Sequence, residues 1–145
     1  MIIEIYSDGS SNGQTLKQDC GGWAFVVIVD GVKVHEGSGG TNTSTNNTME
    51  LQAAVEGLKY VAANPAWVGA QVSLVADSQL VLNYANGTYR CRKLHLAMLH
   101  SNLTRLYKQL NATTRWVRGH TGDKYNEECD VLAKAQRETL MQKKR

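Results

Sequence analysis

The order of strand-like and helix-like segments constrains the fold of this chain more than any other feature. Stretches rich in β-branched and aromatic residues, which are typical of strands, occupy residues 2–8, 23–29, 32–39, 71–77 and 113–119. Stretches with apolar residues every three or four positions, or closed by a helix-ending glycine, occupy about 47–64, 78–87, 95–110 and a final segment from 126. This alternation predicts an α/β fold.

The connections between these segments predict how the strands pair. Asp30-Gly31 joins two strand-like stretches and suits the positive φ angles of a tight hairpin. The first three strands, linked by short turns, should therefore be antiparallel, whereas the helix that follows them permits a parallel crossover to the fourth. We expect one mixed sheet in a single domain of residues 1–145, because a chain of 145 residues is too short for two independent cores.

The apolar segments and the cysteines of the sequence indicate where in the cell the protein is expected to be. No apolar run approaches the roughly 20 residues that a membrane helix needs, and the N-terminal residues lack the pattern of a signal peptide. Cys20, Cys91 and Cys129 are an odd number without paired C-x-x-C spacing, which favours reduced thiols. We therefore expect a cytoplasmic protein with no membrane partner.

The net charge of +3 is unevenly distributed along the chain. Residues 78–122 contain no acidic side chain, yet they carry seven basic ones: Arg90, Arg92, Lys93, Arg105, Lys108, Arg115 and Arg118. Such a stretch could be a solvated helical face, but its single sign favours a polyanionic partner.

Four acidic residues could meet at one edge of the sheet. Asp8 and Asp77 each end an apolar strand, and the carboxyl ends of adjacent parallel strands share an edge where α/β proteins place active sites. Glu50 and Asp130 fall near the starts of two predicted helices and could be aimed at that edge. Carboxylates so close would repel one another unless cations lay between them, which predicts a site for two divalent ions, with Mg²⁺ the expected metal.

Each acid also has a purely structural interpretation. Asn47 and Glu50 match a capping box, and Asp130 could oppose a helix dipole. Asp8 before Gly9 could form a turn, and Asp77 could cap the helix that follows it. Their joint arrangement, rather than any single acid, favours the metal site.

Four segments together resemble the type 1 ribonuclease H family. They are Tyr6-Ser7-Asp8-Gly9-Ser10, Asn46-Asn47-Thr48-Met49-Glu50-Leu51, Asp77-Ser78-Gln79, and Trp116-Val117-Arg118-Gly119-His120 with Asn126-Glu127-Glu128-Cys129-Asp130. They occur in the order and spacing of the family and span nearly the whole chain.

The resemblance implies the ribonuclease H-like fold, a five-stranded mixed sheet flanked by α-helices. It also implies endonucleolytic hydrolysis of the RNA strand of RNA–DNA hybrids, with 5′-phosphate and 3′-hydroxyl products and two Mg²⁺ ions that Mn²⁺ can replace. Metal coordination falls to Asp8, Glu50, Asp77 and Asp130. One ion would generate the nucleophile from water, and the other would stabilise the leaving oxygen. We expect a monomer.

The resemblance also assigns roles to polar residues around the acids. His120 matches a histidine used for proton transfer and product release, and its loop between two glycines allows movement. Ser10, Asn46, Asn47 and Gln79 match positions that contact the 2′-hydroxyls of the RNA strand. Thr45 matches a threonine that helps to hold a DNA-strand phosphate. Asn46 and Asn47 could equally be helix caps.

The chain departs from the family pattern in the segments that bind the hybrid. Many bacterial members carry a basic protrusion after the third acid, and residues 85–99 replace it here. Arg90, Arg92 and Lys93 could partly substitute, with a basic tail at Lys143, Lys144 and Arg145. Contacts from Asn12 and Gln14 do not carry over. The alternatives are a hybrid-binding module with weak catalysis and a nuclease of the same superfamily that cleaves DNA.

Overall fold

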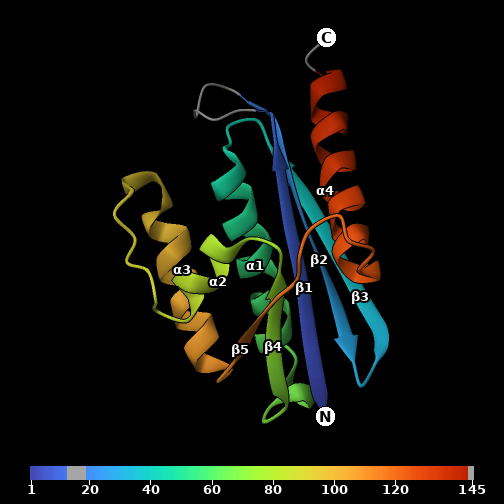
Figure 1. The fold of residues 1–145 in the computed structure, drawn as a ribbon, viewed down its shortest axis with the longest axis vertical. Coiled ribbons are helices and arrows are strands. Elements are labelled where there is room, and N and C mark those ends of the chain that lie inside the picture. The colour runs from blue at the N-terminus through green and yellow to red at the C-terminus, as the bar shows by residue number, and fades with distance from the viewer. Residues whose placement is uncertain (13–18, 144–145) are drawn as a thin grey trace.

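A computed structural model describes residues 1–12 and 19–143, so the expectations for Gln14, Lys144 and Arg145 lie outside the described residues. The strands are β1 (Ile2–Ser11), β2 (Gly21–Val29), β3 (Val32–Thr41), β4 (Gln71–Ala76) and β5 (Thr113–Trp116). The α-helices are α1 (Asn46–Ala62), α2 (Gln79–Ala85), α3 (Ala97–Gln109) and α4 (Lys124–Lys143). Two short 3₁₀ helices are η1 (Pro65–Trp67) and η2 (Leu94–Leu96). Figure 1 shows these elements around one sheet.

The sheet has the mixed topology that the sequence predicts. Its strand order is β3-β2-β1-β4-β5, with β1, β2 and β3 antiparallel and with β4 parallel to both β1 and β5. The β2–β3 hairpin turns through Asp30 and Gly31, whose φ angles of 49° and 83° are both positive. The aspartate–glycine pair thus forms the expected tight turn.

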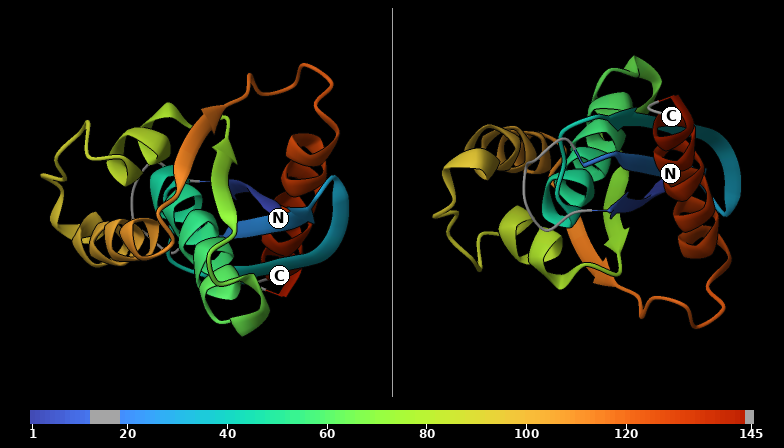
Figure 2. Two further views of the ribbon diagram at one scale, coloured as in Figure 1. Left: turned by 90° about the horizontal axis from the view of Figure 1, so that it is seen from below. Right: turned by 90° about the horizontal axis from the view of Figure 1, so that it is seen from above.

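Helices cover the two faces of the sheet unequally. The views along the sheet show α1, α2 and α3 on one face and α4 on the other (Figure 2). Helix α4 packs on β1, β2 and β3, and its buried Cys129 and Ala133 meet Tyr6 and Val75 in a small apolar cluster. The larger core, around Ile5, lies between α1 and the opposite face. No helix among the residues in the two described ranges is long and apolar enough to cross a membrane.

Several predicted boundaries shift for local reasons. Helix α3 begins at Ala97 instead of His95, because Leu94–Leu96 form a 3₁₀ turn before it. Strand β5 ends at Trp116 instead of residue 119, because its only neighbour, β4, ends opposite it at Ala76. Helix α4 begins two residues before Asn126, since Asp123 accepts a hydrogen bond from the Asn126 N–H, as an N-cap residue does.

Candidate active site

Asp8 and Asp77 lie side by side because of where β1 and β4 stop pairing. The parallel ladder ends at Ser7 opposite Ala76, so both aspartates are the first residues beyond it. Strand β1 nevertheless continues to Ser11, paired with β2 alone. The interpretation of Asp8-Gly9 as a turn is therefore wrong. Asp77 is also not a helix cap, because the Ser78 hydroxyl accepts the hydrogen bond from the Val81 N–H.

Gly9 brings Glu50 to these aspartates. A Cβ atom at Gly9 would lie 2.4 Å from the Glu50 nitrogen and from the Met49 carbonyl carbon, so only glycine lets β1 and α1 approach this closely. The predicted capping box of Asn47 and Glu50 is wrong: the N-cap of α1 is Thr45, which forms a capping box with Thr48. Glu50 is consequently free of any capping role.

Three of the four expected acids converge. One carboxylate oxygen from each of Asp8, Glu50 and Asp77 lies within 4.8 Å of the others. Asp130 is not part of this group; its Oδ2 instead lies 3.1 Å from the Lys134 Nζ, one turn later on α4. Its charge still reaches the group, because it helps to raise the pKa values of Asp8 and Asp77.

The surroundings of the converging acids disfavour the ionised form of their carboxyl groups. The pKa of Asp8 is raised to about 7, mainly by burial and also by the charges of Asp77 and Asp130, while a hydrogen bond with Glu50 opposes the shift. Burial and then the charge of Asp8 raise the pKa of Glu50 well above its usual range. The Glu50 Oε2 atom is buried and has no hydrogen-bond partner among the described residues.

This donor set fits a divalent cation. Mg²⁺ and Ca²⁺ bind oxygen ligands at about 2.0–2.6 Å, so oxygens that share one ion lie within about 5 Å of one another. The three carboxylates satisfy that limit, and the unpartnered Glu50 Oε2 has a lone pair to offer. A cation would also compensate their mutual repulsion. Asp8, Glu50 and Asp77 could therefore hold a metal ion.

The segment after β5 completes the surroundings of Asp77. Burial is the main cause that raises the pKa of Asp77, and the side chains of Asn126 and His120 oppose it. Asn126 is buried, although its Nδ2 atom makes no hydrogen bond within the described part of the chain. A Cβ atom at Gly119 would lie 2.8 Å from the Asp77 Oδ2. Asn126 and Gly119 both lie within the family motifs, but neither was predicted to belong to the site.

His120 lies in an exposed loop beside this group. Its φ of 60° is unusual for a residue other than glycine. The loop is tied on both sides of it, because the Thr121 hydroxyl donates to the Arg118 carbonyl at 2.6 Å and the Gly122 N–H donates to Glu127 Oε1 at 3.1 Å. The backbone thus holds His120 in a strained conformation at the mouth of the acidic group.

Two of the residues expected to contact the substrate already use their hydroxyl groups in hydrogen bonds within the protein. The Ser10 hydroxyl accepts a hydrogen bond from Arg137 Nη1 at 2.7 Å, across from β1 to α4. The Thr45 Oγ1 accepts the Thr48 N–H at 3.2 Å. Both residues are buried. Arg137 has no periodicity or motif that marks it in the sequence, so only the structure reveals its contact.

The remaining expected contacts are more accessible. Asn46 is exposed, and its Oδ1 accepts the Ser11 N–H at 2.9 Å, which joins α1 to the end of β1. Asn47 is partly exposed on the first turn of α1. Gln79 is exposed at the start of α2 and lines a small hollow with Trp116, whose indole N–H donates to the Asp77 carbonyl at 3.1 Å.

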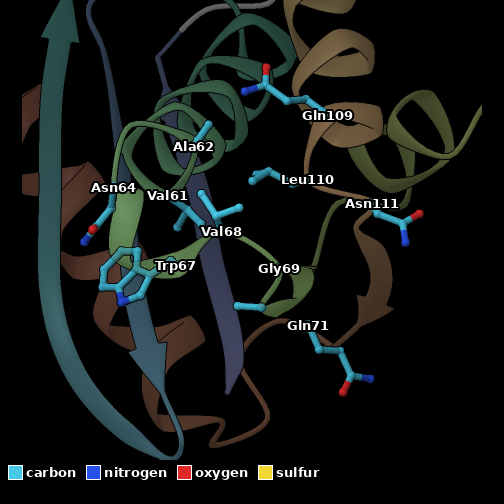
Figure 3. Close-up of a pocket in the computed structure, with 11 residues that line it drawn as sticks. Val61, Ala62, Asn64, Trp67, Val68, Gly69, Gln71, Gln109, Leu110 and Asn111 are labelled. Atoms are coloured by element: carbon cyan, nitrogen blue, oxygen red, sulfur yellow. The ribbon is translucent and has the colours of Figure 1, made fainter.

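A cavity of about 540 Å³ lies elsewhere on the molecule. Figure 3 shows it between the end of α1 and the segments that lead into β4 and β5, with Trp67, Val68 and Leu110 in its wall. It contains no ionisable side chain. Its place at the amino ends of the parallel strands is opposite to that of Asp8 and Asp77, so it has no part in the acidic site.

Comparisons with known proteins agree with this geometry. The RNase H family model matches residues 2–138. A ribonuclease H of Caldanaerobacter subterraneus is 37% identical over 147 aligned positions, covering 93% of this chain and 90% of that protein. A ribonuclease H of Pseudomonas fluorescens is 34% identical, with coverage of 90% and 89%.

Solved structures show the same fold. The RNase H1 of the archaeon Halobacterium salinarum has a TM-score of 0.79 at 25% identity, covering 96% of this chain and 99% of that one. LC11-RNase H1, solved in complex with an RNA/DNA hybrid, has a TM-score of 0.82 at 20% identity, with coverage of 96% and 99%. The fold, the converging carboxylates and the match over nearly the full length establish that this chain belongs to the ribonuclease H family.

Proposed function

We propose that this protein is an endonuclease that hydrolyses the RNA strand of RNA–DNA hybrids and leaves 5′-phosphate and 3′-hydroxyl ends. One observation carries the proposal: Asp8, Glu50 and Asp77 converge within 4.8 Å while a buried Glu50 oxygen has no partner. The family match supports the reaction class, and the hybrid bound to LC11-RNase H1 supports the substrate.

The carboxylates would position two Mg²⁺ ions, with Mn²⁺ able to replace them. Bound there, the ions supply activation of water and stabilisation of charge on the scissile phosphate and leaving oxygen. Asp8, Glu50 and Asp77 provide the ligands, and Asp130 provides a fourth once its carboxylate leaves Lys134. The Asn126 side chain beside Asp77 lowers the pKa of that carboxyl and so favours its charged, metal-binding form.

His120 would move protons between the site and solvent. Its imidazole is exposed, and its charge acts on Asp77. A histidine that titrates near neutral pH can accept and release a proton during each turnover. While the tied backbone holds His120 at the acidic group, rotation of its exposed side chain would let the imidazole approach and leave the site.

The hybrid would lie across the acidic edge of the sheet. Asn46, Asn47 and Gln79 are accessible there and would contact the RNA strand, whose 2′-hydroxyls donate and accept hydrogen bonds. Ser10 would act mainly through its backbone groups, because its hydroxyl is engaged. The hydroxyl and the N–H of Thr45 both bond to Thr48, so Thr45 would hold a DNA-strand phosphate only when these capping contacts open. The acid-free segment 78–122 would attract the phosphate backbones, and the protein would act as a monomer in the cytoplasm.

A substrate panel tests the proposal. Labelled RNA–DNA hybrid, single-stranded RNA and double-stranded DNA are each incubated with the protein in Mg²⁺ and again in EDTA. We expect cleavage of the hybrid RNA strand alone, abolished by EDTA, with 5′-phosphate ends on the products. Cleavage of duplex DNA would identify a nuclease of the wider superfamily, and hybrid binding without cleavage would identify a binding module.

A further inference from the structure

A second concave site lies between α2 and α3, away from the acidic group. The cavity has a volume of about 520 Å³. We call it the tyrosine cavity; the residues of its wall that matter here are Tyr84, Tyr89, Arg90, His100, Tyr107 and Lys108. Its size falls within the range of sites that bind small molecules or single nucleotides.

Aromatic rings dominate the wall of the tyrosine cavity. The rings of Tyr89 and His100 both stand nearly perpendicular to that of Tyr84, at centroid distances of 6.4 Å and 5.2 Å. Tyr84 is buried, whereas Tyr89 is 47% exposed. A half-exposed ring beside a buried, fixed one gives a planar ligand a surface on which to stack.

The charge of the cavity is positive and uncompensated. Arg90 and Lys108 line it, and no acidic residue does. Neither cation forms an ion pair with any residue that the structure describes, and the sequence offers no acid between residues 78 and 122. Aromatic walls with free cations suit a ligand that combines a flat ring with a phosphate.

The cavity connects to the acidic site through a shared wall. Asn86 lines both the tyrosine cavity and the hollow that contains Gln79 and Trp116. Trp116 is 46% exposed, and its indole is hydrogen-bonded to the Asp77 backbone. Two exposed aromatic rings, Trp116 and Tyr89, therefore mark a path from the acidic group to the cavity.

We propose that this path binds single-stranded nucleic acid, with one nucleotide seated in the tyrosine cavity. Stacking on aromatic rings combined with a positively charged track is how proteins hold unpaired strands without sequence preference. The proposal rests on the proposed function only for the source of the strand, which would be an unpaired tail of the hybrid. Arg90 and Lys108 would contact its phosphates, and Tyr89 its base.

Binding of a fluorescein-labelled ten-residue oligothymidylate, measured by anisotropy at low salt in EDTA, tests the proposal without any cleavage. We expect Tyr89→Ala to weaken binding about tenfold, and Tyr89→Phe, which keeps the ring, to bind within twofold of wild type. The double variant Arg90→Ala, Lys108→Ala should weaken binding at least tenfold. It should also reduce the salt slope by about 1.4, for two lost phosphate contacts.

A matched control removes two cations that line a different groove, Lys59 and Arg105. The double variant Lys59→Ala, Arg105→Ala changes the net charge equally and should alter binding less than twofold. Equal weakening by both double variants, or no effect of Tyr89→Ala, would overturn the proposal. The binding assay contains EDTA and no hybrid, so it does not depend on cleavage. A failure of the proposed function would instead appear as absence of hybrid cleavage by the wild type in Mg²⁺, and the two failures are therefore distinguishable.

Discussion

At the scale of single residues, the neighbours of each acid decide what it can do. Asp130 has a lysine 3.1 Å away, so its charge is compensated without a metal. Among the residues of the two described ranges, Glu50 has no such neighbour, and its Oε2 is buried without a partner. A buried carboxyl in this condition gains from a bound cation much more than an exposed, paired one does. The two acids should therefore differ in how strongly they depend on the metal.

The central aspartates give the sharpest test of the metal site. We expect Asp8→Asn and Asp77→Asn each to reduce the turnover of hybrid cleavage at least 1000-fold, as an order-of-magnitude estimate, because an amide cannot replace a carboxylate ligand. The far-ultraviolet circular dichroism of both variants should match wild type. Single-turnover cleavage in Mg²⁺ measures the loss; a variant with near-normal rates would remove that residue from the site.

His120 should matter less than the acids. His120→Ala is expected to reduce turnover by roughly 10–100-fold, since proton transfer by a side chain contributes on the order of 10²–10⁴ and water can partly replace it. Rates measured from pH 6 to 9 provide the check, because the variant should lose the part of the wild-type pH dependence that the His120 side chain contributes. An identical profile in both proteins would exclude the role.

The sequence was sufficient to predict which types of residue form the site, but it did not reveal the contacts that these and neighbouring residues make. The aspartates after two strands and the glutamate early in a helix follow from local patterns, and the structure brings them together. The engagement of Ser10 by Arg137 joins residues 127 positions apart, and no local pattern encodes it. Asn126 was likewise visible in a motif, but its place beside Asp77 depends on how α4 packs on the sheet.

At the scale of elements, the start of α1 fixes the position of Glu50. The Thr45 hydroxyl accepts the Thr48 N–H, and the Thr45 N–H donates to the Thr48 hydroxyl at 2.8 Å. Two otherwise unpaired backbone donors are thus satisfied. The next residue, Asn46, accepts the Ser11 N–H and so joins this first turn to the end of β1. The sequence placed the cap two residues too late, because Asn47 and Glu50 have the right spacing for a capping box while a pair of threonines is a weaker pattern.

Removal of this cap should destabilise the whole domain. We expect Thr45→Ala to lower the free energy of unfolding by about 1 kcal/mol, whereas Thr45→Ser, which keeps the hydroxyl, should change it by only a few tenths. Urea unfolding followed by circular dichroism measures both values. Equal losses in the two variants would show that the methyl group of Thr45, rather than its hydroxyl, stabilises the helix start.

Close packing of β1 on α1 predicts a larger effect at Gly9. Gly9→Ala would place a Cβ atom 2.4 Å from backbone atoms of α1, which cannot move aside as a flexible side chain would. We expect a loss of about 2–4 kcal/mol and displacement of Glu50, with cleavage falling together with stability. The control is Gly69→Ala, where φ is +84° but the space is open, so the loss should be about 1 kcal/mol. Urea unfolding compares the two.

At the scale of the whole molecule, the fold places the acidic site where ionised carboxyls are destabilised unless a cation is bound. The mixed sheet, with its three antiparallel strands and a parallel crossover to the fourth, follows from segment order and connection length, so the sequence sufficed to predict it. The consequence of burying Asp8 beside two partly buried carboxyls does not follow from the sequence, because it depends on solvent exclusion around Asp8. Burial raises the pKa of Asp8 from an ordinary value of 3.8 to about 7.

This shift predicts how stability varies with pH without metal. Between about pH 4 and 7, the folded protein retains a proton on Asp8 that the unfolded chain has lost, so this group makes stability fall as pH rises and then level off above 7. Fully expressed, the difference corresponds to about 4 kcal/mol, and sharing of protons with Glu50 reduces it. Asp8→Asn mimics the protonated carboxyl and removes this contribution.

Urea unfolding of wild type and Asp8→Asn in EDTA isolates the effect of the group. We expect the variant to be about 1–3 kcal/mol more stable than wild type at pH 8 and nearly equal to it at pH 4. At pH 4 Asp8 keeps its proton in the folded protein, whereas at pH 8 the folded wild type must carry the charge of Asp8 in a buried position. Saturating Mg²⁺ at pH 8 should raise the stability of wild type, since the ion binds the folded state alone, and should leave the variant almost unchanged. A stability difference that is the same at both pH values would mean that burial of Asp8 does not oppose its charge, and the main physical reason for a cation at this site would be lost.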